Sequence, residues 1–282
     1  MTEQGEAPTI AVRCESSDPE RATVATELAR VLGLPLVHGA VDGYALLLVV
    51  TDERLELLQV DSVEGPAHCE FTSGAFGYRR AQPLRRELLA RAVGFKGKAL
   101  HVIDMTAGLG RDAALLALLG CRVTAIERHP VVFALLEDGL RRARNTPDMP
   151  DALAERLTLV RADACDYLDA LPADSQPDVI YLDPMFPERT QTALVKKEMR
   201  LLSRLLGGAE DADRLLQAAV RTGCHRVVVK RPLHALHLAA PLVRQPPLQF
   251  RGRSARFDVY FPEASPGVWA ASSTSRASRS TS

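Results

Sequence analysis

The 282-residue sequence predicts an α/β protein: a mostly parallel sheet with a C-terminal antiparallel hairpin, preceded by a small N-terminal α/β unit. Two observations predict this fold class. From about residue 98 onward, short apolar runs alternate with longer segments of helical spacing, a pattern typical of parallel strands joined by helices. Near the C-terminus, the segments 247–252 and 256–261 have the pattern of a hairpin, which would add one antiparallel strand.

The first unit, residues 1–75, has the pattern of a strand, a helix and a hairpin. We expect a strand at 10–14 and a helix at 19–33 that ends at Gly33, a plausible C-cap. The apolar runs 44–50 and 55–60 flank a polar turn and are expected to pair. This unit contains no dense set of chemically active residues.

The second unit, residues 76–263, carries the alternating pattern. The expected elements are a strand at 99–105, a helix at 110–120, a strand at 122–127, a helix at 130–144, a strand at 156–163, a strand at 177–183, helices at 192–207 and 211–223, a strand at 226–230 and the closing hairpin. The Ser/Ala-rich tail, 264–282, has little to bury and is expected to be disordered.

Composition excludes several classes of protein. The N-terminus is polar and acidic, and no apolar run is long enough to span a bilayer, so we expect a cytoplasmic protein without a membrane partner. The five cysteines lie far apart without a C-x-x-C motif, which fits a reducing compartment. His234 and His237 lack a third ligand, so no metal site is expected. The net charge of zero does not exclude nucleic acid, because basic residues occur in separate clusters.

The ends of the predicted strands carry the residues that suggest a ligand. In such sheets, ligands bind beyond the carboxyl ends of the strands. Gly108 and Gly110 follow the first strand and allow a tight turn with free N–H groups at the next helix. Glu127 ends the second strand and could accept both hydroxyls of a ribose. Asp163 and Ala164 end the third strand and leave room for a flat base. The pattern indicates a nucleoside, although such acids also serve as helix N-caps.

The glycine-rich turn leaves two classes of nucleoside cofactor open. Gly108, Gly110 and Ala113 fit a weak dinucleotide pattern, so a nicotinamide-dependent oxidoreductase is an alternative. However, the turn begins with Asp104, which would repel a pyrophosphate. An acid there suits the sulfonium and α-amino groups of S-adenosylmethionine.

The segment "DPMF", residues 183–186, favours S-adenosylmethionine. It resembles the [DNS]-P-P-[FYW] tetrad of methyltransferases that act on exocyclic amino groups, with Met185 in place of the usual proline. Asp183 and the carbonyl of Pro184 could accept the two N–H bonds of an amine and direct its lone pair. Phe186 could stack on a base turned out of its helix. Adenine, guanine and glutamine amides all remain possible acceptors on this pattern.

Three long stretches narrow the resemblance. Residues 107–140, 179–202 and 226–232 together resemble the bacterial small-subunit ribosomal RNA (guanine-N2)-methyltransferases of the J type, over roughly residues 70–262. The resemblance implies a class I methyltransferase fold with a Rossmann-like sheet, S-adenosylmethionine as donor, and the N2 amine of one guanine of 16S ribosomal RNA as acceptor. The donor contacts expected from the strand ends and from this resemblance are Asp104, Gly108, Gly110, Arg111, Asp112, Glu127, Arg128, Asp163, Ala164 and Asp183. The family often has small hydroxyl residues where this chain has 163–164.

Basic residues near the expected mouth suggest contacts with RNA. Lys196 and Lys197 follow the tetrad, and Lys230 and Arg231 end the fifth strand, although such charges also occur on solvent-facing surfaces. The segment 77–80, "GYRR", is interpreted as part of the rim. The expected partner is small-subunit ribosomal RNA or the 30S particle. A non-catalytic RNA-binding protein of ribosome assembly is a further alternative.

Overall fold

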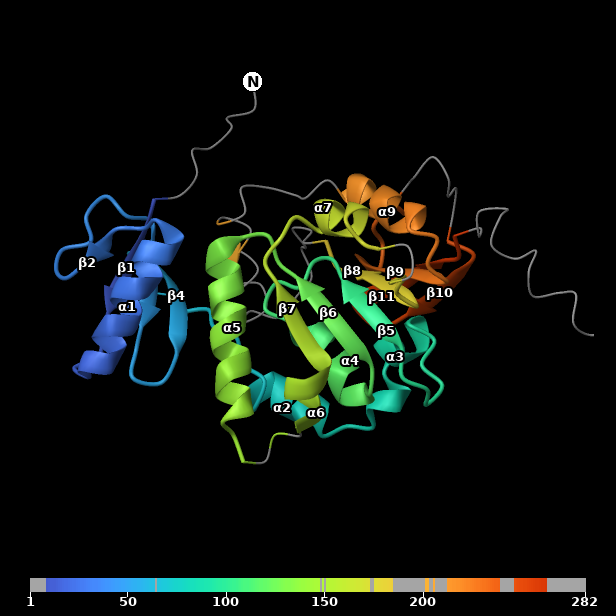
Figure 1. Ribbon diagram of the computed structural model, residues 1–282, viewed down its shortest axis with the longest axis horizontal. Helices are drawn as coiled ribbons and strands as arrows, with labels where there is room; N and C mark the ends of the chain where they lie inside the picture. Colours follow the sequence, from blue (N-terminus) through green and yellow to red (C-terminus); the bar gives the residue numbers. More distant parts are fainter. Residues whose placement is uncertain are drawn as a thin grey trace, which may run out of the picture.

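The computed structural model describes residues 9–63, 65–147, 149, 151–172, 175–184, 201–202, 205, 212–238 and 246–262 (Figure 1). The strands form two sheets, of four and seven strands. The elements of the first part are β1 (Ile10–Cys14), α1 (Pro19–Leu32), β2 (Leu36–Val37), β3 (Leu46–Val50) and β4 (Leu55–Gln59). Those that follow are α2 (Gly74–Arg80), the 3-10 helix η1 (Leu84–Arg86), α3 (Leu88–Ala92), β5 (His101–Asp104), α4 (Arg111–Leu119), β6 (Arg122–Ile126), α5 (Pro130–Arg144), α6 (Asp151–Arg156), β7 (Leu157–Val160), α7 (Ala164–Asp169), β8 (Val179–Leu182), α9 (Ala212–Arg221), β9 (Arg226–Pro232), β10 (Leu248–Arg251) and β11 (Ala255–Tyr260).

The seven-stranded sheet has the order β10-β11-β9-β8-β5-β6-β7. The pairs β5–β6, β6–β7, β5–β8 and β8–β9 are parallel, whereas β11 runs antiparallel to both β9 and β10. The predicted parallel sheet with one antiparallel strand is therefore confirmed. The chain builds outward from β5 to β7 and then returns to β8 on the other side of β5. This reversal between β5 and β8 is the point at which such sheets bind their ligands.

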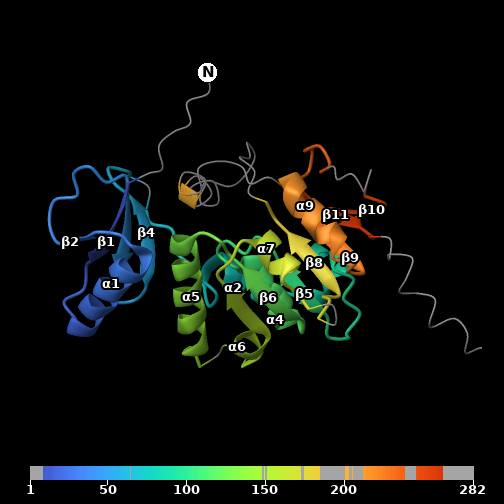
Figure 2. The same cartoon turned by 45° about the horizontal axis from the view of Figure 1, so that its top comes forward.

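Alternation along each buried strand gives the sheet two apolar faces. Val102 packs in one core cluster and the next residue, Ile103, packs in the other. α4 and α5 cover the first face, while α7 and α9 cover the second (Figures 1 and 2). Because both faces are covered, the strands read as continuous apolar runs, as in other parallel sheets.

The four-stranded sheet has the order β2-β1-β3-β4, and β3 and β4 form the predicted antiparallel hairpin. The predicted helix is also confirmed: α1 ends at Gly33, which has a left-handed φ of 65°. α1 packs Ala25 and Ala29 into the core cluster shared with the larger sheet. The proposed boundary at residues 75 and 76 lies within α2 and stays a prediction.

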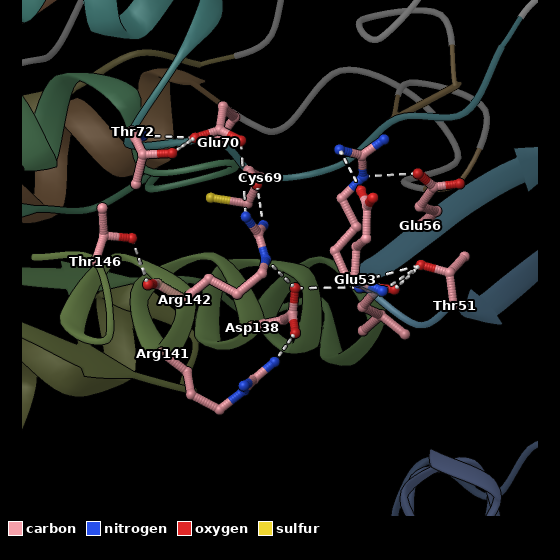
Figure 3. A network of polar contacts seen from close by, with 12 residues as sticks. Thr51, Glu53, Glu56, Cys69, Glu70, Thr72, Asp138, Arg141, Arg142 and Thr146 are labelled. Atoms are coloured by element: carbon pink, nitrogen blue, oxygen red, sulfur yellow. Dashed lines mark hydrogen bonds and ion pairs between the residues drawn. The ribbon is translucent and has the colours of Figure 1, made fainter. Parts of the chain in front are cut away.

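A polar junction joins this smaller sheet to α5 (Figure 3). Asp138 of α5 accepts a hydrogen bond from the backbone N–H of Leu55, at 3.1 Å, and forms ion pairs with Arg141 and Arg142. Arg142 also donates to the carbonyl of Cys69. The first residue of β4 is thus held directly by a carboxylate of the larger unit.

Several expectations fall outside the described residues: most of the helix at 192–207 and the tail at 264–282. Within the described part, no helix is long and apolar enough to cross a membrane. The same part holds no group of three or more metal-ligating side chains.

Candidate active site

The turn between β5 and α4 depends on two glycines. Gly108 and Gly110 have left-handed φ values of 54° and 70°. A side chain at Gly110 would collide with Leu136 Cδ1 and would lie 3.1 Å from Phe71 Cζ. The turn is tied to the next strand by the backbone N–H of Ala107, which donates to Ile126 at 2.9 Å. Gly110 is therefore required both by its left-handed backbone and by its close approach to Leu136 of α5 and to Phe71, which only glycine permits.

Glu127 holds this turn from the end of β6. It is buried, at 7% exposure. Its Oε2 accepts from the backbone N–H of Gly108 at 2.9 Å, and its Oε1 accepts from that of His129 at 2.7 Å. A carboxylate oxygen has more than one lone pair and can accept from more than one donor. This geometry fits the predicted contact with a ribose.

A small pocket, with a volume of about 50 Å³, opens at the carboxyl ends of β6 and β7. Its lining consists of Met105, Thr106, Ile126, Glu127, Arg128, Ala162, Asp163, Ala164, Arg214 and Leu215. The structure thus brings together four residues predicted from separate strand ends, and surrounds them with apolar side chains suited to a base. The buried carboxylate of Glu127 suits the ribose of S-adenosylmethionine, and the apolar lining suits its adenine, so the residues present fit this cofactor.

Asp163 has a structural role in addition to lining this pocket. Its Oδ1 accepts from the backbone N–H groups of Cys165 at 2.8 Å and Asp166 at 3.3 Å, so Asp163 caps α7. Arg214 of α9 forms an ion pair with the same oxygen at 3.4 Å. The N-cap interpretation is confirmed, and a contact between Asp163 and the donor stays a prediction.

Beside the pocket, Asp112 lies at the centre of a network of charges. This first-turn residue of α4 is 8% exposed. Its Oδ1 accepts from Arg79 Nη1 at 3.0 Å, and its Oδ2 accepts from Tyr181 Oη at 2.7 Å and Lys230 Nζ at 2.8 Å. Burial opposes its ionisation, but Lys230 and Arg79 hold the pKa of Asp112 well below its usual range. Both carboxylate oxygens of Asp112 are therefore engaged by the protein, and its predicted contact with the donor stays a prediction.

Lys230 connects Asp112 to the "DPMF" segment. Its Nζ lies 2.7 Å from Asp183 Oδ2, and Asp183 is 38% exposed in its side chain. The backbone N–H of Asp183 donates to Thr106 Oγ1 at 2.7 Å, and Thr106 lines the pocket. Asp183 thus sits between the glycine-rich turn and β9. Burial opposes the charge of Lys230, yet the two carboxylates raise its pKa.

Asp104 is a third carboxyl group in this region. It is 2% exposed, and it accepts from the backbone N–H of Thr106 at 3.0 Å. Burial is the main cause that raises the pKa of Asp104 to about 8, and the charges of Asp112 and Asp183 add to it. A cation bound nearby would favour its ionised form.

The structure corrects one predicted RNA contact and reassigns another. Arg231 is 6% exposed and donates to the carbonyl of Leu236 at 2.7 and 3.2 Å, which argues against a contact with RNA. Lys230 donates to two carboxylates of the site, those of Asp112 and Asp183. The predicted residues Phe186, Lys196 and Lys197 lie outside the described residues. Pro184 directly follows Asp183, and Arg111 begins α4.

Sequence reasoning missed Tyr181 and Thr106, and it placed Arg79 only loosely, on the rim. Tyr181 is a fully buried tyrosine within an apolar strand, and a polar group there needs a buried partner. That signal was available from the sequence. Arg79 offered no such signal, because its partner Asp112 lies 33 residues away.

Comparison with known proteins agrees with this geometry. A family model described as "Putative SAM-dependent methyltransferase" matches residues 32–262. The chain is 47% identical to the ribosomal RNA small subunit methyltransferase J of Nitrosococcus oceani, covering 86% of this chain and 94% of that protein. It is also 47% identical to the protein of the same name from Thioalkalivibrio sulfidiphilus, covering 89% and 97%.

A solved structure shares the fold. The crystal structure of a SAM-dependent methyltransferase from Neisseria gonorrhoeae superimposes with a TM-score of 0.69 at 37% identity, covering 91% of this chain and 97% of that one. These relatives are methyltransferases and not nicotinamide-dependent oxidoreductases. The chain belongs to the S-adenosylmethionine-dependent methyltransferase family that includes the ribosomal RNA small subunit methyltransferases J.

Proposed function

We propose that this chain methylates the exocyclic N2 amine of one guanine in small-subunit ribosomal RNA. The observation that carries the proposal is Asp183, a partly exposed carboxylate at the end of β8. Its backbone is hydrogen-bonded to Thr106, a residue of the pocket that we assign to the donor. An acceptor held by Asp183 would therefore lie next to the donor. The names of the relatives support ribosomal RNA as the substrate.

The chemistry requires the protein to position the amine. The lone pair of a guanine N2 amine is delocalised into the ring, so the amine is a poor nucleophile. Asp183 and the carbonyl of Pro184 would accept its two N–H bonds and direct the lone pair. S-adenosylmethionine supplies an electrophilic methyl group when bound. Asp183 and Pro184 would hold the amine while its nitrogen takes the methyl group from the sulfur of the donor, and the surplus proton on nitrogen would leave to water.

The remaining assignments follow from this arrangement. Glu127, Arg128, Asp163 and Ala164 would hold the nucleoside of the donor, and Asp104 would lie near its cationic end. Gly108, Gly110 and Arg111 would contribute the turn and the start of α4. Phe186 would stack on the guanine, while Lys196 and Lys197 would contact RNA phosphates.

The cellular setting is part of the proposal. We propose that the enzyme acts in the cytoplasm on small-subunit ribosomal RNA, free or within the 30S particle. Residues 1–75 would form the small N-terminal unit and residues 76–263 the methyltransferase domain.

A methyl-transfer assay tests this function. The purified protein is incubated with labelled S-adenosylmethionine and small-subunit particles from cells that lack the enzyme, and the RNA is digested to nucleosides. The expected product is labelled N2-methylguanosine. Label in another nucleoside would refute the guanine assignment, and label in no RNA would refute the RNA substrate.

An Asp183→Ala variant tests the mechanism in the same assay. Loss of a polar contact of this kind costs a few kcal/mol of barrier, so we expect turnover to fall about a hundredfold or more. Asp42→Ala, an exposed acid of the first unit, is the matched control and should retain the full rate. Full activity of Asp183→Ala would exclude the proposed orientation of the amine.

A further inference from the structure

We propose that Lys230 is a positioning residue that fixes the orientation and the charge of Asp183. This inference rests on the proposed function, because it assigns Asp183 to the acceptor amine. Lys230 lies on β9, next to β8, and its Nζ bridges Oδ2 of Asp183 at 2.7 Å and Oδ2 of Asp112 at 2.8 Å. An ammonium group donates three hydrogen bonds, so it can serve both carboxylates at once.

The Asp112 end of this bridge is held firmly. Asp112 is buried at the start of α4, where the helix dipole favours a negative charge. Tyr181 of β8 and Arg79 of α2 donate to it from two other elements. Arg79 is itself held by Glu87 through two hydrogen bonds of 3.0 Å. Lys230 is therefore anchored on a fixed carboxylate.

The Asp183 end of the bridge is the exposed one. The backbone N–H of Asp183 is bonded to Thr106, and its side chain reaches Lys230 through Oδ2. One contact fixes the position of the main chain, and the other fixes the rotation of the carboxylate. A rotamer fixed in this way is pre-organised for orientation of the substrate.

Lys230 also balances the charge of the site. Three carboxyl groups, those of Asp104, Asp112 and Asp183, influence one another here. Like charges near one another favour protonation of one of them, and here the pKa of Asp104 is the one that burial and the neighbouring charges raise. A protonated Asp183 would have less capacity to accept an N–H bond from the amine. The ammonium of Lys230 between two of these groups keeps Asp183 an acceptor.

This role differs from contact with RNA in what kinetics would show. A lysine that binds phosphate contributes to substrate binding, so its loss raises KM for RNA. A lysine that orients Asp183 acts in the transition state, so its loss lowers kcat. Lys230 already contacts two carboxylates and is 30% exposed in its side chain, which favours the second role.

The test compares Lys230→Met with the wild type and with Lys98→Met, an exposed lysine that serves as the control. We expect kcat of Lys230→Met to fall about tenfold to a hundredfold, with KM for the particle within about twofold. The acid limb of its pH–rate profile should move to higher pH, because Asp183 has lost its cation. Lys230→Arg, which keeps the charge, should recover part of the loss. Calorimetric binding of S-adenosylmethionine and thermal unfolding report whether each variant is folded.

The outcomes separate this inference from the proposed function. If the wild type forms no N2-methylguanosine, the proposed function fails, and the variants are then compared on whatever product the wild type forms. If the wild type is active and Lys230→Met keeps its kcat and pH profile, the inference is overturned. A raised KM with unchanged kcat would return Lys230 to RNA binding and also overturn it. If Lys230→Met does not fold, Tyr181→Phe, which loosens Asp112 with little change in volume, should lower kcat in the same direction; unchanged kcat there would count against the proposal.

Discussion

Asp104 should make the folded protein less stable as the pH rises. Its carboxyl group is buried, and its pKa is raised from 3.8 to about 8. Asp104→Asn is the informative variant, because an amide has the shape of the protonated acid and can still accept from Thr106. In the variant, the residue has no charge at any pH. The difference in stability between the two proteins therefore isolates the ionisation of Asp104.

The sign and size follow from proton linkage. Between pH 3.8 and about 8, the folded state keeps a proton that the unfolded state has lost, so the contribution of Asp104 is fully present below pH 3.8 and is lost as the pH rises. At 1.36 kcal/mol for each unit of pKa, the free energy of unfolding should fall by about 4 kcal/mol between pH 5 and pH 8 relative to the variant. Above the folded pKa, the difference should become constant.

Urea unfolding of both proteins at pH 5, 6, 7 and 8, without donor, measures this difference. Asp42→Asn, an exposed acid, serves as the control and should follow the wild type at each pH. A difference between wild type and Asp104→Asn that stays constant from pH 5 to 8 would falsify the reasoning. It would mean that Asp104 ionises in the folded protein as it does in the unfolded chain.

Three further predictions concern the donor and the junction between the sheets. A cationic donor binds more tightly when Asp104 is ionised. The affinity of the protein for S-adenosylmethionine, measured by calorimetry, should therefore rise by up to about tenfold per pH unit between pH 6 and 8, and should not change with pH in Asp104→Asn. Glu127→Gln should weaken donor binding about tenfold or more, because an amide accepts through one atom only; equal affinity would exclude the ribose contact. Asp138→Asn should lower the free energy of unfolding by about 1–3 kcal/mol and speed hydrogen exchange in β4, because the contact with Leu55 and two ion pairs weaken. Unchanged hydrogen exchange in β4 would show that the junction does not depend on the charge of Asp138.

The sequence predicted those parts of the site that follow from strand ends. Glu127 comes directly after an apolar run and Asp163 three residues after the end of one, and the rule that parallel strands end at one edge was enough to bring them together. The two glycines of the turn were predictable for the same local reason. These features depend on residues that are close in sequence to an element boundary.

The charge network was not predictable in the same way. Asp112 and Lys230 lie 118 residues apart in the sequence. They meet because β9 is two strands from β5 in the sheet and the side chain of Lys230 on β9 faces α4. A pattern of charges along a chain does not show which side chain finds which partner. Lys230 and Arg231 both suggested an exposed basic patch, and the structure instead shows an ion pair for one and burial for the other.

The position of β11 has a consequence for how the chain reaches its folded state. β11 follows every other strand of the described chain in sequence, yet it lies between β9 and β10, and β10 pairs with β11 alone among these strands. A nascent chain released only as far as Ser254 would therefore have β9 as an open edge and β10 without a neighbour. The sheet can close only after β11 has left the ribosome. Until then the edge of β9 is a site for wrong strand pairing, so the sheet is completed by a strand that is synthesised after both of its neighbours.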